Sequence, residues 1–280
     1  MDPALSDPYQ HEMASSPSLP VSSQTTNGVL VLWGSIDPAI VDEDALNDWW
    51  TNEHLPERVC LPGFQCARRY RALEPEHGPN EYLALYETSN VQDLASAEYS
   101  YALNHPTKRT VQFISCLAKM SRFACERIRS KSSPVSTSDQ ATKTHELLLM
   151  LFFEVNNAID DPTRLIGDYL SRKEHGTLAE ITRTQIAKVN PNITRAGSAS
   201  KSYDGVRFDS SSGGDGTKTA GTFIALFEFA STADGSVPKS SPNSEWLTSL
   251  IAEMETAGLH IQYINKYTLL ASLARFQIAC

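Results

Sequence analysis

Apolar runs and helix-like repeats alternate along this chain in the order strand, helix, strand, strand, helix, strand. Residues 28–35 form a β-branched and apolar run that ends at Asp37-Pro38, a chain breaker. From Asp42, acidic residues open a segment with apolar residues at helical spacing, and we expect Pro56 and then Leu61-Pro62-Gly63 to end this helix. The other elements predicted in the first half are strands over 64–73, 82–88 and 110–120 and a helix over 90–102.

The second half of the chain repeats the first at four places that keep the same order. The matched segments are 29–33 with 149–153, Glu53-His54 with Glu174-His175, 82–87 with 223–228, and 111–114 with 261–264. The spacing grows mainly between the second and third matches, where the Gly- and Ser-rich residues 195–218 read as an inserted surface loop. We therefore predict an internal duplication.

The repeated order predicts the fold class. A βαββαβ unit of this length is typical of the ferredoxin-like arrangement, an antiparallel sheet with both helices on one face. Apolar residues occupy both faces of the strands over 28–35 and 82–88, so the face without helices also needs a cover. We predict an α+β protein in which two tandem ferredoxin-like units place their sheets together to form an α/β barrel.

Polar stretches rich in Ser and Pro divide the chain into segments. Residues 1–27 lack a periodic apolar pattern and read as a disordered tail. Residues 131–144 read as a linker between two folded units. The predicted units are therefore 28–130 and 145–280, the second of which carries the inserted loop.

Charge and hydropathy exclude several classes of protein. Thirty-three acidic and 24 basic residues give a net charge of −9, without an extended basic run, so we expect no nucleic-acid partner. No apolar run reaches the ~18 residues of a membrane span, and the first residues do not resemble a signal peptide. The five cysteines are scattered without metal-ligand spacing, and we expect reduced thiols in a cytoplasmic protein.

Four segments of the first half carry a family likeness, namely residues 48–58 (DWWTNEHLPER), 62–64 (PGF), 68–70 (RRY) and 82–87 (YLALYE). Together they resemble the dimeric α/β-barrel superfamily and, within it, EthD-like proteins, whereas the second half resembles them only weakly. The resemblance implies two ferredoxin-like units with facing sheets and a small-molecule cavity in each. Its members include cofactor-free decarboxylases and cyclases of polyketide biosynthesis, quinol-forming monooxygenases, haem-binding enzymes and stress-response proteins, so fold narrows function only slightly.

His54 is the main catalytic candidate. It follows Trp50 by four residues and therefore continues the apolar stripe of its helix toward the sheet. A neutral imidazole there can take a proton from a phenol or a carbon acid, or return one to a carbanion after carbon dioxide leaves. The alternative is that His54 caps the end of the helix by bonding a carbonyl of the last turn.

Residues on the predicted strands supply further candidates. Arg69 and Tyr70 lie on opposite faces of one strand, and an arginine directed into the cavity would hold a carboxylate or enolate with two hydrogen bonds. The alternative for such an arginine is an ion-paired strand end. We name Arg69 and Tyr70 with His54 as catalytic candidates, and the substrate-binding candidates are Trp33, Trp50, Tyr82, Tyr86, His105 and His175. Because a glycine follows His175, we expect one active half-site.

The predicted function is a small-molecule enzyme without metal or cofactor that acts on an aromatic or polyketide-like acid in secondary metabolism. The expected reaction is acid/base lyase or cyclase chemistry, such as decarboxylation or aldol-type cyclisation, with His54 as the acid/base. One alternative is a non-catalytic ligand-binding or stress-response barrel, and another is a haem protein or quinol monooxygenase. The chain either closes its barrel internally, as a monomeric pseudo-dimer, or forms a homodimer.

Overall fold

The computed structural model describes residues 27–37, 39–73, 80–132, 147–156, 161–173, 181–208, 219–229 and 245–280. Within these ranges, eight strands form a closed barrel in the order β1-β3-β2-β8-β5-β7-β6-β4, and every neighbouring pair is antiparallel. The strands are β1 (Gly28–Ile36), β2 (Phe64–Ala72), β3 (Asn80–Thr88), β4 (Leu117–Ser132), β5 (Leu147–Asn156), β6 (Ile181–Val189), β7 (Thr219–Phe229) and β8 (Leu259–Ala274).

The two halves of the chain contribute equivalent parts of the barrel. The first half has the strand order β4-β1-β3-β2, the second half has β8-β5-β7-β6, and the pairs β2–β8 and β4–β6 join them. The predicted barrel is therefore present. Strands β1 and β3 are buried on both faces, because one face lines the barrel interior and the other lies under helices.

The barrel interior is filled by side chains. Trp33 of β1 stacks between Phe123 of β4 and Tyr263 of β8, with ring centroids 5.3 Å away on each side. Leu83, Leu85 and other apolar residues from both halves complete this core. Because side chains fill it, the barrel interior is a structural core.

Buried charges from both halves also meet inside the barrel. Arg68 of β2 pairs with Glu87 of β3 and with Glu228 of β7, the latter at 3.2 Å. Arg183 of β6 and Arg127 of β4 bind the same Glu87 carboxylate at 2.9 and 2.6 Å. This network ties the two halves together, because each acidic group is shared between arginines of different strands.

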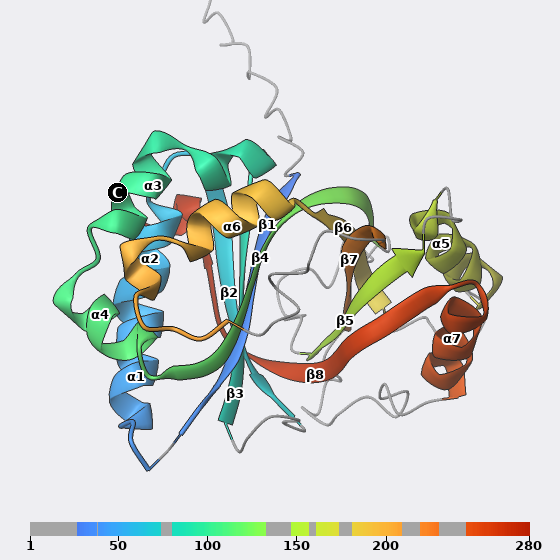
Figure 1. Cartoon of the computed structure of the whole chain (residues 1–280), viewed down its shortest axis with the longest axis horizontal. Coiled ribbons are helices and arrows are strands. Elements are labelled where there is room, and N and C mark those ends of the chain that lie inside the picture. The colour runs from blue at the N-terminus through green and yellow to red at the C-terminus, as the bar shows by residue number, and fades with distance from the viewer. Residues whose placement is uncertain are drawn as a thin grey trace, which may run out of the picture.

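Helices cover the outside of the barrel (Figure 1). Those over the first half are α1 (Glu43–Trp49), the π-turn η1 (Trp50–His54), α2 (Leu55–Val59), η2 (Val91–Ala95), α3 (Ala97–Asn104) and α4 (Lys108–Ile114), joined there by α6 (Pro191–Ser198) and η3 (Lys201–Tyr203). On the opposite side lie α5 (Pro162–Lys173) and α7 (Glu245–Thr256), while η5 (Arg275–Gln277) follows β8. In the part of the chain that is described, no helix is long and apolar enough to cross a membrane.

The first helical segment passes through Pro56, which was predicted to help end it, and stops at Val59, just before the other predicted end signal, Leu61-Pro62-Gly63. Asp42 caps its start by accepting a hydrogen bond from the Ala45 N–H at 3.0 Å. Pro56 lacks an N–H and would disrupt a regular α-helix. The wider turn η1 precedes it, in which the Leu55 N–H bonds to the Trp50 carbonyl, and the chain then continues as α2.

The predicted strand over 110–120 is wrong for its first part. Thr107 caps a helix, α4, in which Thr110, Phe113 and Ile114 bury one face at helical spacing. Residues 111–114 therefore do not correspond to 261–264, which lie in β8. The corresponding strands are β4 and β8, each 16 residues long.

The predicted loop 195–218 is ordered where it is described. Helix α6 continues to Ser198, η3 follows, and Phe208 forms an isolated bridge with Met120 of β4. Residues 209–218 lie outside the described residues, as do 1–26 of the predicted tail and 133–144 of the predicted linker.

One pair of cysteines contradicts the expectation of five reduced thiols. Cys60, after α2, forms a disulfide with Cys280 at the C-terminus, while Cys66, Cys116 and Cys125 are free. The pair is 220 residues apart in sequence, and only the fold brings it together, because the segment after β8 returns to the end of α2. Arg275 in this segment donates hydrogen bonds to the Val59 and Leu61 carbonyls at 2.8 and 2.7 Å.

Candidate functional site

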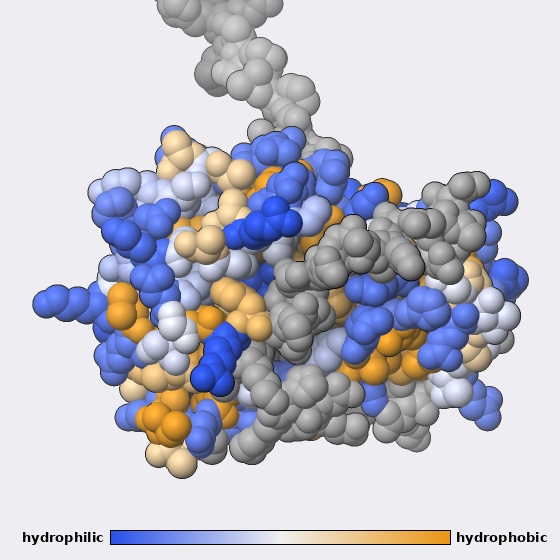
Figure 2. Space-filling view, in the orientation of Figure 1, coloured by the Kyte–Doolittle hydropathy of each residue, from blue (hydrophilic) through white to orange (hydrophobic). Residues whose placement is uncertain are grey.

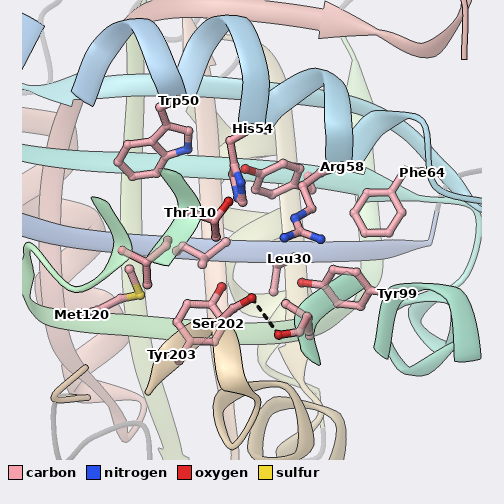
Figure 3. Close-up of a pocket in the computed structure, with 14 residues that line it drawn as sticks. Leu30, Trp50, His54, Arg58, Phe64, Tyr99, Thr110, Met120, Ser202 and Tyr203 are labelled. Carbon is pink, nitrogen blue, oxygen red and sulfur yellow. Dashed lines mark hydrogen bonds between the residues drawn. The ribbon is translucent and has the colours of Figure 1, made fainter. Parts of the chain in front are cut away.

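A cavity lies outside the barrel, between the helices of the first half and the outer face of the sheet (Figure 3). The space between its walls, counted together with the part that is open to solvent, is about 420 Å³. The lining residues are Leu30, Leu32, Trp50, His54, Arg58, Phe64, Tyr86, Tyr99, Leu103, Thr110, Ile114, Met120, Ser202 and Tyr203. Most of the wall is apolar or aromatic, and the polar groups gather at a few positions, as is usual for small-molecule sites.

One helical face supplies the side chains on the upper wall. Trp50, His54 and Arg58 are each four residues apart, and residues at this spacing share a helix face. Figure 3 shows all three side chains directed from the helix into the cavity. Arg109 of α4 forms an ion pair with Glu53 on the outer side of this helix. His54 makes no side-chain capping bond, and the helical segment continues past it to Val59.

His54 is neutral in this environment. Its residue is only 8% exposed, and Nδ1 has no hydrogen-bond partner. Burial, followed by the positive charge of Arg58, holds the pKa of His54 well below its ordinary value. The nearest carboxylate oxygen belongs to Glu57 and lies 3.8 Å from Nδ1. A neutral imidazole with a free ring nitrogen is able to accept a proton from a bound molecule.

Arg58 is a site residue that the sequence analysis did not single out. It is 3% exposed, and neither Nη1 nor Nη2 makes a hydrogen bond. The carboxylate of Glu57, one third exposed at the rim, lies 3.8 Å from Nη2. A buried guanidinium normally has several acceptors, so this one is available to a ligand. Its four-residue spacing from His54 is the signal in the sequence that would have identified it.

The second half of the chain closes the opposite wall with η3. Ser202 donates a hydrogen bond to the Leu103 carbonyl at 2.7 Å, and the Lys201 N–H reaches the Asn104 side chain at 3.3 Å. Tyr203 is buried beside them. Burial raises the pKa of Tyr86 and of Tyr203, so both phenols stay protonated.

Of the residues expected in the site, His54, Trp50 and Tyr86 line this cavity. Arg69 lies behind it, with its guanidinium carbon 4.6 Å from the Trp50 ring centroid and 4.7 Å from that of Tyr82. It bonds to Asn47 and Thr51, and burial lowers its pKa to about 10. Tyr82 in turn bonds to Glu43. Arg69 and Tyr82 thus support the wall that Trp50 forms.

The remaining expected residues lie elsewhere. Trp33 and Tyr70 are packed in the barrel interior, on the other face of the sheet. His105 is exposed and stacks on Tyr101, with ring centroids 3.9 Å apart. His175 lies outside the described residues.

The helices of the second half pack on the outer sheet face mainly through apolar side chains. Ile166, Tyr169 and Leu250 pack between the helices and the outer sheet face, and the Tyr169 hydroxyl bonds to the Trp246 carbonyl at 2.6 Å. A smaller cavity of about 270 Å³, counted with the part open to solvent, lies between α5 and the strands β4 and β6, and its lining includes Arg129, Lys131 and Thr184 as well as Leu170 and Ile186. Among the described residues, no three His, Cys, Asp or Glu side chains gather as they would around a metal ion.

The sequence matches no protein-family model and no curated protein. Among solved structures, an anthrone oxidase-like protein superposes with a TM-score of 0.54 at 9% identity, over 89% of this chain and 94% of its own. A candidate monooxygenase from Fusobacterium nucleatum has a TM-score of 0.50 at 9% identity, over 89% and 95% of the two chains. The chain is therefore similar to these proteins in fold over 89% of its length.

Proposed function

We propose that this chain is a small-molecule enzyme in which His54 moves a proton on an aromatic or polyketide-like acid. The observation that carries the proposal is a buried, neutral histidine with an unbonded ring nitrogen beside an unbonded guanidinium, in a cavity lined by aromatic rings. We also propose that the chain consists of two ferredoxin-like units in tandem, of which the first is EthD-like.

The proton step depends on the charges that develop on His54 and on the substrate beside Arg58. Nδ1 of His54 takes a proton from a carbon or hydroxyl of the substrate, and the electron pair remains on the substrate as an enolate or phenolate. Without that negative charge, a protonated His54 beside Arg58 would be unfavourable, so proton transfer and substrate charge develop together. In a decarboxylation, the bond to the carboxylate carbon breaks, carbon dioxide leaves, and protonated His54 returns its proton to the carbanion. In an aldol-type cyclisation, the carbanion attacks a carbonyl of the same molecule.

A second candidate is oxygenation of a phenolic substrate. The names of the two similar structures, anthrone oxidase-like protein and candidate monooxygenase, favour it. The first step would be the same, because deprotonation by His54 would produce the electron-rich carbon that reacts with oxygen. The two reactions then differ in what is consumed and released.

The first half-site is proposed as the active one, and the second unit as a cover that completes the barrel. The smaller cavity under α5, which has no histidine among its described lining residues, and the contribution of η3 to the first cavity support this division. Because β2–β8 and β4–β6 close the barrel within one chain, we favour a monomer with an internal pseudo-dimer over a homodimer.

The test is an assay of aromatic and β-keto acids that follows carbon dioxide release and oxygen uptake together. His54→Ala is compared with His105→Ala, which removes an exposed histidine outside the cavity. We expect His54→Ala to lose at least about 100-fold in turnover and His105→Ala to keep it. Oxygen uptake without carbon dioxide release would shift the assignment to oxygenation. Full activity of His54→Ala would refute the role of His54. A Soret band after haem addition would replace the proposed acid/base reaction with haem chemistry.

A further inference from the structure

Two guanidinium groups are buried next to Tyr99 in the cavity wall, and among the described residues that line the cavity none is acidic. Arg58 is one of them, and Arg122 of β4 is the other, with no exposed surface. Within the described part of the chain, the one carboxylate that pairs with either group belongs to Glu57, 3.8 Å from Arg58 and at the rim. Buried positive charges are costly unless they are paired, so this arrangement lacks a negative partner inside the cavity.

Arg122 is held by neutral groups. Its Nη1 donates to the Thr194 carbonyl and its Nη2 to the Tyr99 hydroxyl, each at 3.2 Å. Gly197 of α6 lies against the guanidinium so closely that a Cβ at that position would be 2.2 Å from Nη1. The helix therefore fixes the position of Arg122, which in turn fixes the Tyr99 hydroxyl.

Tyr99 lies between the two arginines. Its ring centroid is 6.0 Å from the guanidinium carbon of Arg58, while its hydroxyl oxygen accepts the bond from Arg122. Because that oxygen is an acceptor for Arg122, the hydroxyl hydrogen is left to donate to another group. Figure 3 shows Tyr99 and Arg58 on the same side of the cavity, with the hydroxyl and the guanidinium directed inward.

We propose that Arg58 and Tyr99 form a carboxylate subsite, with Arg122 as the positioning residue that orients the Tyr99 hydroxyl. A carboxylate of the ligand would receive hydrogen bonds from the free Nη atoms of Arg58 and from Tyr99, and it would balance the buried charge. The apolar remainder of the wall, including Leu30, Phe64 and Met120, would take the aromatic body. The inference rests on the proposed function in one respect: the ligand is the substrate of the same cavity.

The test measures binding and not turnover, by calorimetry on the whole chain. The probes are 2-naphthoate and its neutral counterpart 2-naphthamide, which have nearly the same shape. We expect the wild-type protein to bind the carboxylate at least about tenfold more tightly than the amide. Arg58→Met should abolish this preference while retaining amide binding, and Tyr99→Phe should reduce it. Arg164→Met, at a largely exposed arginine on α5, is the matched control and should preserve the preference.

The preference ratio separates positioning from general damage, because a distorted cavity weakens both probes together. Arg122→Lys should lower the ratio of the two affinities relative to the wild-type protein. Equal affinity for the two probes, no binding of either, or an unchanged ratio in Arg58→Met would overturn the subsite. A preference for the carboxylate without turnover of any acid would leave the subsite standing and the proposed function refuted. Turnover that depends on His54, without a preference for the carboxylate probe, would refute the subsite and leave the proposed function standing.

Discussion

Arg58 follows His54 by four residues on one helix, and both side chains are buried against the same cavity without a hydrogen bond to His54 Nδ1 or to either Arg58 Nη atom. The π-turn that carries the chain past Pro56 places them there. The positive charge of Arg58 disfavours a charged His54. His54, in turn, supplies no negative charge that would balance Arg58. The pair is therefore suited to a ligand that brings a negative charge and gives up a proton.

The low pKa of His54 predicts a pH dependence of stability. Between the native pKa and the ordinary value of about 6.5, the unfolded chain binds a proton that the folded chain does not. The free energy of unfolding should therefore decrease as the pH falls through about 6.5, and the His54 contribution should be fully present above it. His54→Gln should flatten this part of the profile in urea titrations between pH 5 and pH 8, about the range in which histidine titrates. A profile identical to that of the wild type would contradict the buried neutral state.

Removal of Arg58 should raise the pKa of His54. Burial is the larger cause of the lowered pKa and Arg58 the smaller, so Arg58→Met should raise the value and still leave it below the ordinary one. An NMR titration of the His54 ring measures this directly. Arg164→Met is the control and should leave the His54 titration unchanged. An unchanged or lower pKa in Arg58→Met would show that the two groups do not interact as described.

Glu87 in the barrel interior should be essential for stability. Burial alone would raise its pKa, but Arg68, Arg183 and Arg127 hold that pKa far below its usual range. Glu87→Gln leaves these three guanidinium groups short of a counter-charge, and we expect a loss of about 3–5 kcal/mol in unfolding free energy. The wild type should also lose this contribution as the pH falls through the native pKa of Glu87.

The matched control is Glu98→Gln, at an exposed position on α3. Urea unfolding of the two variants at neutral pH gives the comparison. Equal stabilities would mean that the network does not join the two halves of the barrel.

The disulfide between Cys60 and Cys280 should be countable in solution. Protein denatured without reductant should show three free thiols, Cys66, Cys116 and Cys125, and five after reduction. Cys280→Ser should lower the unfolding free energy by about 2–4 kcal/mol, because the bond closes a long loop. Cys116→Ser, at a free cysteine, should have a much smaller effect. Five thiols before reduction would contradict the disulfide.

The sequence predicted those features that depend on periodicity. Apolar residues on both faces of 28–35 and 82–88 indicated a sheet covered on both sides, and the barrel with its outer helices covers it in that way. The place of His54 on an apolar helical stripe indicated that it faces the sheet, and it lines the cavity under that helix.

Features that depend on distant contacts were missed. Arg58 was not named as a candidate, because the local sequence does not show that Glu53 binds Arg109 and that Arg58 faces the cavity. Tyr203 lies in a segment whose Ser and Gly content resembles a loop, and its burial comes from packing on the first half. On the face of the molecule that Figure 2 shows, hydrophilic and hydrophobic residues lie in small, mixed groups.

A crystal structure of the protein with bound 2-naphthoate tests the central claim most directly. The account predicts that the naphthyl ring lies between Phe64 and Leu30, with its carboxylate against Arg58 and Tyr99 and one edge facing His54. Density for the ligand in the barrel interior or under α5, or an empty cavity at a saturating concentration, would contradict it.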